Sequence, residues 1–174
     1  MFETPNCNDG SLTPPRLRLD ISGGNLNVPG GPVGNPRVIH EAVKEAGFEG
    51  IQGGDAALCR ELGLGRTGCS RVNLVGEADP IAATEKDAGC ACVTLHVGWG
   101  LEDDSTLYRL VEDILQTSER RSIPIYIETH RTTITQDIWR TVQLVKRFPG
   151  VRFNGDFSHW YTGLEMVYGG IDTK

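Results

Sequence analysis

The sequence predicts an α/β fold in which parallel strands alternate with helices. Compact apolar runs recur at intervals of roughly 20 to 30 residues from residue 35 onward, with helical patterns between them. This spacing suits strand–helix–strand units, because two parallel strands need a crossover helix to connect them. The strands are continuous apolar runs, which is typical of a sheet covered on both faces. We expect strands near residues 17–21, 48–52, 71–75, 91–96, 123–128 and 151–156.

The helices are predicted from apolar periodicity and from their end signals. Residues 36–46 place apolar side chains on one helical face, with Pro36 in the first turn and Gly47 as the stop. A second helix falls within 77–89, and Ser105 opens a third. Thr133 and Gln136 have the spacing of a capping box and predict the start of a fourth helix. The joints AGFEGI and AGCACV suggest a weak internal repeat of helix, glycine cap and strand.

The predicted organisation is one domain over residues 17–174, preceded by a poorly ordered segment at 1–16. The segment 20–36 is rich in Gly, Asn and Pro, and it is either a flexible surface loop or a binding loop at the rim of a site. Six strands suffice for an open doubly wound sheet. A closed eight-stranded barrel would lack two strand–helix units, and its open edge would favour a homo-oligomer or instability.

Composition excludes several classes of protein. The formal charge is 17 − 23 = −6 without a basic stripe, which argues against nucleic acid as a partner. No apolar run reaches the length that a membrane span needs, and the N-terminus is not a signal peptide. Five cysteines without a disulfide framework suit the reducing cytoplasm. We expect Cys90 and Cys92 to share one face of a strand, as buried thiols rather than zinc ligands.

Acidic and imidazole side chains end the last two predicted strands. Glu128 and His130 follow the run IPIYI, and Asp156 and His159 follow VRF. The ends of neighbouring parallel strands lie side by side, so these groups should converge as ligands for a divalent metal. Structural alternatives exist for both acids, since Glu128 can pair with Arg131 and Asp156 can cap the next helix.

For other polar residues, the sequence pattern is weaker evidence of a functional role. His96 ends the fourth strand beside flexible glycines, where it either contacts a substrate or makes a structural hydrogen bond. Arg131 is placed for an anionic or polyhydroxylated substrate. His40 is expected on the surface of its helix, and Cys59 and Cys69 are expected to be structural. The glycines of GLGRTG at 63–68 lack the context of a nucleotide site.

Several motifs together resemble the sugar phosphate isomerase/epimerase family of xylose isomerase-like (β/α)8 TIM barrels. They are RVN at 71–73, EADP at 77–80, TLHVGWGLEDD at 94–104, ETHR at 128–131, TITQDIWRT at 133–141 and FNGDFSHWYTG at 153–163. The resemblance covers roughly residues 36–170 and implies about six of the eight βα units of the barrel.

The resemblance implies a divalent metal (Mn, Mg, Co or Zn) bound by Glu128 and Asp156. It implies substrate contacts from His96 and His159. His130 and Arg131, which follow Glu128 in the sequence, are further predicted substrate contacts. The family's remaining His and Glu ligands have no counterpart in this chain. The implied activity is isomerisation or epimerisation of a sugar or sugar phosphate, with Glu128 as the base and an enediolate intermediate. The alternatives are an inosose-dehydratase-like lyase and a catalytically inactive truncated barrel.

Overall fold

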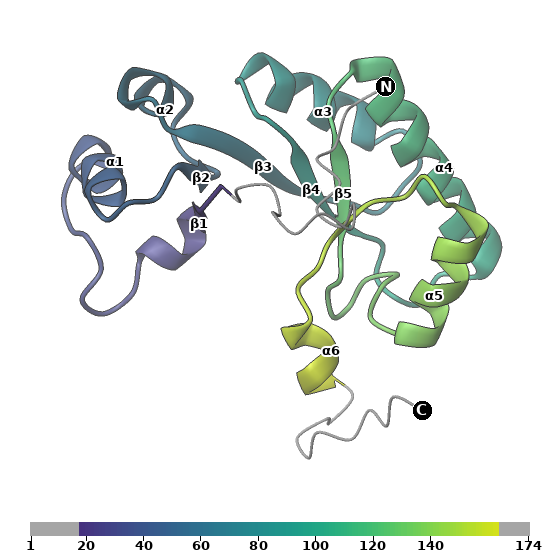
Figure 1. The fold of residues 1–174 in the computed structure, drawn as a ribbon. Coiled ribbons are helices and arrows are strands. Elements are labelled where there is room, and N and C mark those ends of the chain that lie inside the picture. Colours follow the sequence, from purple (N-terminus) through teal and green to yellow (C-terminus); the bar gives the residue numbers. More distant parts are fainter. Residues whose placement is uncertain (1–17, 164–174) are drawn as a thin grey trace, which may run out of the picture. The chain divides into compact units, whose positions relative to one another are not determined.

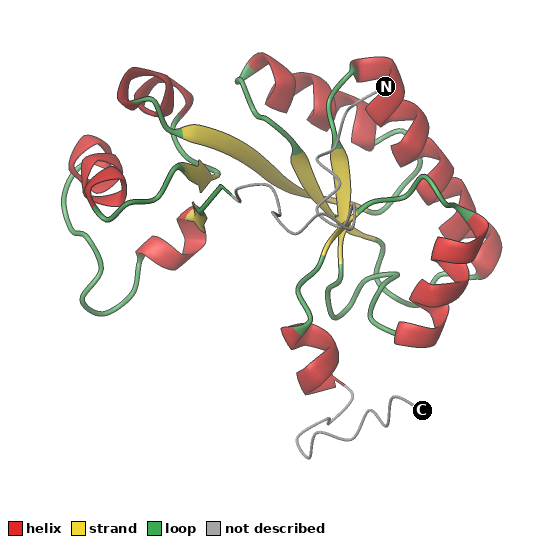
Figure 2. Cartoon of the chain, viewed as in Figure 1, coloured by secondary structure: helices red, strands yellow, loops and turns green. Residues whose placement is uncertain are grey.

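The computed structural model of the chain describes residues 18–163, and it confirms an α/β fold with six strands among helices (Figures 1 and 2). Neighbouring strands of the sheet follow the chain order from β1 to β6. The strands are β1 (Asp20–Ser22), β2 (Gly50–Gln52), β3 (Gly65–Val72), β4 (Val93–Val97), β5 (Ile125–Glu128) and β6 (Phe153–Asn154). The helices are η1 (Gly23–Leu26), α1 (Pro36–Glu45), α2 (Ala56–Leu62), α3 (Ala78–Asp87), α4 (Asp104–Arg121), α5 (Ile138–Arg147) and α6 (Ser158–Gly163).

The chain divides into two compact units, which we describe separately. The described part of the first unit comprises residues 18–68 and 85–91. Its strands are parallel, with Ile51 of β2 aligned with Ile21 of β1 and with Arg66 of β3. A small apolar core forms around Val43 and Ile51 under α1 and α2. The first unit is therefore a short parallel sheet with its own core.

The second unit comprises residues 69–84 and 92–163 of the described chain. Strand β5 pairs in parallel with β4 and with β6, and the register aligns Leu95 with Ile127 and Glu128 with Asn154. The fully buried side chains of this unit include Leu95 of β4, Ile127 of β5, and Leu107, Leu110 and Ile114 of α4. This core fixes the carboxyl ends of β4, β5 and β6, where the polar side chains of the site begin.

Some predicted elements differ from the structure. Strand β3 begins at Gly65 and ends at Val72, earlier than predicted, because Gly65 and Arg66 pair with β2. The strand stops there because the Glu77 carboxylate accepts the N–H groups of Asn73 and Leu74. Helix α2 was not predicted, although its Asp55 cap and its Gly63 terminus at φ 69° are ordinary end signals.

The predicted capping box is wrong. Helix α5 begins at Ile138, and Asp137 caps it by accepting the N–H of Arg140 at 2.7 Å. Thr133 instead donates its hydroxyl proton to the carbonyl of His130 at 2.6 Å. The hydroxyl thus fixes the loop after β5, because a short polar side chain competes for nearby backbone groups.

The predictions for Cys90, Cys92 and His40 are also wrong in part. Cys90 and Cys92 both precede β4, and they belong to different units. His40 is buried at 7% exposure rather than on the surface. The predicted disorder at 1–16 and the chain after residue 163 lie outside the described residues.

Candidate functional site

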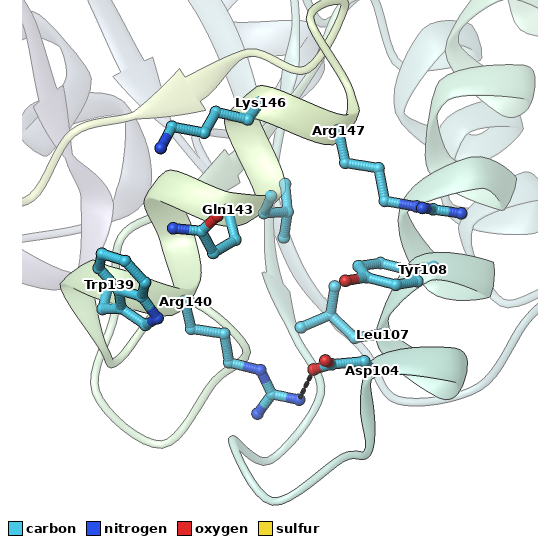
Figure 3. Close-up of a pocket in the computed structure, with 9 residues that line it drawn as sticks. Asp104, Leu107, Tyr108, Trp139, Arg140, Gln143, Lys146 and Arg147 are labelled. Atoms are coloured by element: carbon cyan, nitrogen blue, oxygen red, sulfur yellow. Dashed lines mark hydrogen bonds and ion pairs between the residues drawn. The ribbon is translucent and has the colours of Figure 1, made fainter.

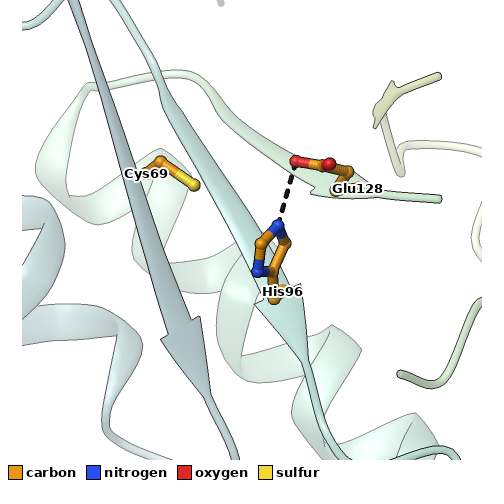
Figure 4. A group of neighbouring side chains, drawn as sticks. All are labelled: Cys69, His96 and Glu128. Carbon is orange, nitrogen blue, oxygen red and sulfur yellow. Dashed lines mark ion pairs between the residues drawn. The ribbon is translucent and has the colours of Figure 1, made fainter. Parts of the chain in front are cut away.

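Glu128 is the centre of the candidate site. It is the last residue of β5, and its side chain is only 12% exposed. Its Oε2 lies 3.2 Å from Nε2 of His96 on β4 and accepts the amide N–H of Asn154 on β6 at 3.3 Å. Figure 4 shows His96 facing the carboxylate from the neighbouring strand. Three adjacent strand ends therefore hold one carboxylate between an imidazole and an amide.

Two further imidazoles extend the site. The ring centroids of His96 and His130 are 4.3 Å apart, and those of His130 and His159 are 3.9 Å apart. Glu128, His130 and His159 each offer a ligand atom, and these atoms all lie within 4.8 Å of one another. The three residues come from the end of β5, the loop that follows it, and α6. This arrangement brings together Glu128 and three of the predicted histidines.

One nitrogen of His130 is bound to the backbone. His130 Nδ1 lies 2.6 Å from the carbonyl oxygen of Arg131, which can only accept a hydrogen bond, so Nδ1 carries a hydrogen and Nε2 is the nitrogen left for another partner. Burial lowers the pKa of His159, and the neighbouring charge of His130 lowers it further. Neutral imidazole nitrogens beside a carboxylate are donors that a divalent metal such as Zn²⁺ accepts. The donor set therefore fits a divalent cation.

Asp156 lies next to this group. Its Oδ1 accepts the N–H of Ser158 at 3.0 Å and the hydroxyl of Ser158 at 2.5 Å, at the start of α6. The hydroxyl of Ser158 holds the pKa of Asp156 below its ordinary value, and burial opposes this effect. Its Oδ2 lies 3.5 Å from Nε2 of His159. Among residues 18–163, the close groups of potential metal ligands contain Glu128 but not Asp156, so its role as a ligand stays a prediction.

Buried threonines fix the loop that carries His130. Thr135 donates its hydroxyl proton to the carbonyl of Glu128 at 2.6 Å and accepts the N–H of His130 at 3.1 Å. Its own carbonyl accepts the indole N–H of Trp160 at 2.7 Å. Sequence reasoning missed these positioning residues and Asn154. The signal was present in the hydroxyl-rich run TTIT at 132–135, shortly after the histidine at a strand end.

Two arginines lie near the strand ends. Arg131 is exposed, and its role in binding a substrate stays a prediction, as do those of His96, His130 and His159. Arg71, on β3, was not singled out in the sequence. Its guanidinium donates to the carbonyls of Gly98 at 2.6 Å and Thr132 at 3.3 Å and lies 4.9 Å from the ring centre of Trp99. Arg71 therefore ties the loop after β4 to the loop after β5.

Cys69 is a further residue that the sequence did not assign to the site. It lies on β3 and is exposed, and its sulfur belongs to a second close group with His96 and Glu128 (Figure 4). The ligand atoms of these three residues also lie within 4.8 Å of one another. The structure thus places a thiol where the sequence predicted only a structural cysteine.

A separate cavity of about 640 Å³ lies between α4 and α5 (Figure 3). Arg140 lies 3.5 Å from Asp104 there, and the Arg147 guanidinium lies 4.2 Å from the ring centre of Tyr108. Both guanidinium groups already have partners in the wall of the cavity. We therefore place the candidate chemistry at the strand ends rather than in this groove.

Comparisons with known proteins support the fold. No protein-family model matches the chain, and no curated protein matches its sequence. Among solved structures, it is similar to the probable 3-DHS dehydratase AsbF, involved in petrobactin synthesis, from Bacillus anthracis. The TM-score is 0.62 at 15% identity, over 84% of this chain. At this identity the likeness shows a shared fold and nothing further. The chain spans 65% of the length of the AsbF chain.

No helix within residues 18–163 has both the length and the apolar character that crossing a membrane requires.

Proposed function

We propose that this chain is, or is part of, a metal-dependent isomerase or epimerase that acts on a sugar or sugar phosphate. The observation that carries the proposal is Glu128, a largely buried carboxylate held by His96 and Asn154 beside two further imidazoles. A carboxylate in such a site is suited to remove a proton, and the surrounding imidazoles and amide suit a substrate with several hydroxyl groups.

Glu128, His130 and His159 supply the donors for a divalent metal, and Asp156 is a further ligand in the proposal. When bound, the metal would polarise a substrate carbonyl as a Lewis acid. The lowered pKa of His159 favours this use, since a protonated ring has no lone pair to donate.

The remaining steps belong to the side chains of this chain. Glu128 takes the proton from the carbon next to the carbonyl and returns it to a neighbouring carbon, which gives isomerisation. Return of the proton to the opposite face gives epimerisation. His96 Nε2, 3.2 Å from Glu128, orients the carboxylate, and the exposed Arg131 is available to an anionic group of the substrate. A positioned base of this kind contributes about 10²–10⁴-fold to the rate.

A lyase is the second candidate, because AsbF is described as a probable dehydratase. Removal of the same proton is also the first step of dehydration next to a carbonyl, and the two functions then differ in the fate of a neighbouring hydroxyl group. In the lyase, that hydroxyl leaves as water and carries away the proton that Glu128 has removed. A chain that binds metal without turning over any substrate would correspond to the inactive alternative.

The test is exchange of substrate hydrogen with solvent deuterium. The full chain is loaded with Mn²⁺ or Co²⁺ and incubated in D₂O with a panel of ketoses, aldoses, their phosphates and cyclic polyhydroxy ketones. We expect deuterium at the carbon next to the carbonyl, and a fall of about 10²–10⁴-fold in Glu128→Gln. The matched control is Glu112→Gln, which changes an exposed carboxylate on α4 and should exchange at the wild-type rate.

Mass spectrometry of the products separates the candidates. A product of unchanged mass, apart from deuterium, supports the isomerase or epimerase, whereas loss of water supports the lyase. Exchange by Glu128→Gln at the wild-type rate would overturn the role of Glu128 in either reaction. Metal binding without exchange of any substrate would argue for the inactive alternative.

A further inference from the structure

We propose that Cys69, His96 and Glu128 form a second metal position, selective for a thiophilic divalent cation such as Zn²⁺. It lies on the β3 and β4 side of Glu128, whereas His130 and His159 come from the loop after β5 and from α6. The proposal shares Glu128 with the proposed function but does not depend on which substrate is turned over.

The topology places the three ligands on adjacent strands. Cys69 is on β3, His96 on β4 and Glu128 on β5, and these strands are neighbours in the sheet. Figure 4 shows the Cys69 sulfur and the His96 ring pointing toward the same region as the carboxylate. Within this group, Nε2 of His96 and Oε2 of Glu128 are 3.2 Å apart, and all ligand atoms lie within 4.8 Å of one another.

These separations suit a tetrahedral ion. Zinc binds sulfur at about 2.3 Å and nitrogen or carboxylate oxygen at about 2.0–2.2 Å, which places ligand atoms of one ion about 3.4–3.6 Å apart. The 3.2 Å between His96 and Glu128 is close to these values, and the sulfur of the exposed Cys69 lies within 4.8 Å of both ligand atoms. Three protein ligands with one open position form the arrangement of catalytic zinc sites.

The thiol determines which metal is preferred. Thiolate sulfur is a soft ligand that suits Zn²⁺ and Co²⁺, whereas Mg²⁺, Mn²⁺ and Ca²⁺ prefer oxygen. On binding, Cys69 loses its proton to solvent and the thiolate sulfur bonds to the ion. The two oxygens of Glu128 allow one carboxylate to serve both positions, as bridging carboxylates do in two-metal sites.

The test is titration of the reduced, metal-free full chain with Co²⁺, followed by absorption spectroscopy. A Co²⁺ ion bound to a thiolate gives a strong near-ultraviolet charge-transfer band that nitrogen and oxygen ligands do not give. We expect this band in the wild type, its disappearance in Cys69→Ser, and its displacement by one equivalent of Zn²⁺. Cobalt affinity at this position should fall at least about 10–100-fold in Cys69→Ser. Mutation of a residue that only hydrogen-bonds to a metal ligand already costs that much, and Cys69 would be a ligand itself.

Cys92→Ser is the matched control, because Cys92 belongs to the same unit and immediately precedes β4, at the opposite end of that strand from His96. It should keep the band. Absence of the band in the wild type, or its persistence in Cys69→Ser, would overturn the proposal. His96→Gln provides a second variant, and it should weaken the band even if Cys69→Ser were unstable.

The outcome is independent of the proposed function. The band reports sulfur ligation, and solvent exchange reports proton removal by Glu128. A chain that shows exchange without the band would refute the second metal position alone. A chain that shows the band without exchange would refute the proposed function alone.

Discussion

The two units use the same residue types in opposite ways. In the first unit, His40 lies within α1, its Nδ1 is 2.7 Å from the carbonyl oxygen of Pro36, and its Nε2 accepts the N–H of Asp55 at 3.0 Å. Both nitrogens are thus occupied by the backbone. In the second unit, three imidazoles converge beside Glu128. A histidine with both nitrogens satisfied by the backbone is structural, and histidines that share a carboxylate form a site.

The cysteines repeat this contrast. In the first unit, the thiol of Cys90 donates to Glu85 at 3.0 Å, and Arg66 lies 2.8 Å from the same Glu85 oxygen. Burial, followed by the hydrogen bond to Glu85, raises the pKa of Cys90 to about 12. This thiol stays protonated at neutral pH, which disfavours its use as a metal ligand. Cys69 is exposed beside an imidazole and a carboxylate, which is why the contrast points to chemistry in the second unit.

Replacing Asp156 by Asn tests how far the metal site of the second unit extends. If Asp156 is a ligand, we expect Asp156→Asn to weaken Mn²⁺ or Zn²⁺ binding by at least about 10–100-fold, because an amide binds these ions less well than a carboxylate. Isothermal titration calorimetry measures the change. Asn also caps helices well, so the start of α6 should persist in the variant. Unchanged metal affinity would show that Asp156 serves only to accept the hydrogen bonds of Ser158 at the start of α6.

Replacing His40 by Ala tests the structural role of the histidine in the first unit. We expect the free energy of unfolding in urea to fall by about 1–3 kcal/mol, because the N–H of Asp55 loses its buried acceptor. Metal affinity should stay unchanged. The matched variant His159→Ala should weaken metal binding and cost less stability. If His40→Ala reduced metal affinity as much as His159→Ala does, the division of roles between the two units would be wrong.

The fold was predictable to a large extent because its signals are local. Apolar runs and glycine stops indicated six strands and most helices, and the structure confirms the α/β arrangement. Helix α2 was missed because its seven residues carry too short an apolar pattern. The start of α5 was misplaced because Thr133 and Gln136 have the spacing of a capping box, and that spacing does not show that the Thr133 hydroxyl bonds to His130 instead.

For the site, the sequence predicted which acidic and imidazole residues meet, but not the residues that position them. Strand ends indicated that Glu128, His130 and His159 would meet, since each follows an apolar run. Cys69 could not be assigned in this way, because its strand, GRTGCSRV, is mostly polar and was placed too late in the chain. Asn154 and Thr135 act through hydrogen bonds to Glu128, and only the pairing of β5 with β6 and the fold of the loop show those contacts.

Asp79 provides the mildest test, because it is a charged residue of the second unit outside the site. Arg121 and then Arg120, both at the end of α4, lower its pKa through hydrogen bonds, and Arg120 lies 2.8 Å away. A carboxylate with a lowered pKa stabilises the fold above its unfolded pKa of about 3.9, and this contribution is lost as the pH falls toward the folded value. Asp79→Asn should therefore lower Tm slightly at pH 7.

The deficit in Tm should shrink as the pH falls below about 4, since the Asp79 carboxylate then binds a proton in the unfolded chain and its lowered pKa stabilises the fold less. Thermal unfolding followed by circular dichroism between pH 2.5 and 7 measures this convergence, and metal affinity at pH 7 should match the wild type. A deficit that grew at low pH would contradict the lowered pKa. Weaker metal binding would show that charge anywhere in the second unit affects the site, whereas unchanged binding restricts the chemistry to side chains that converge on Glu128.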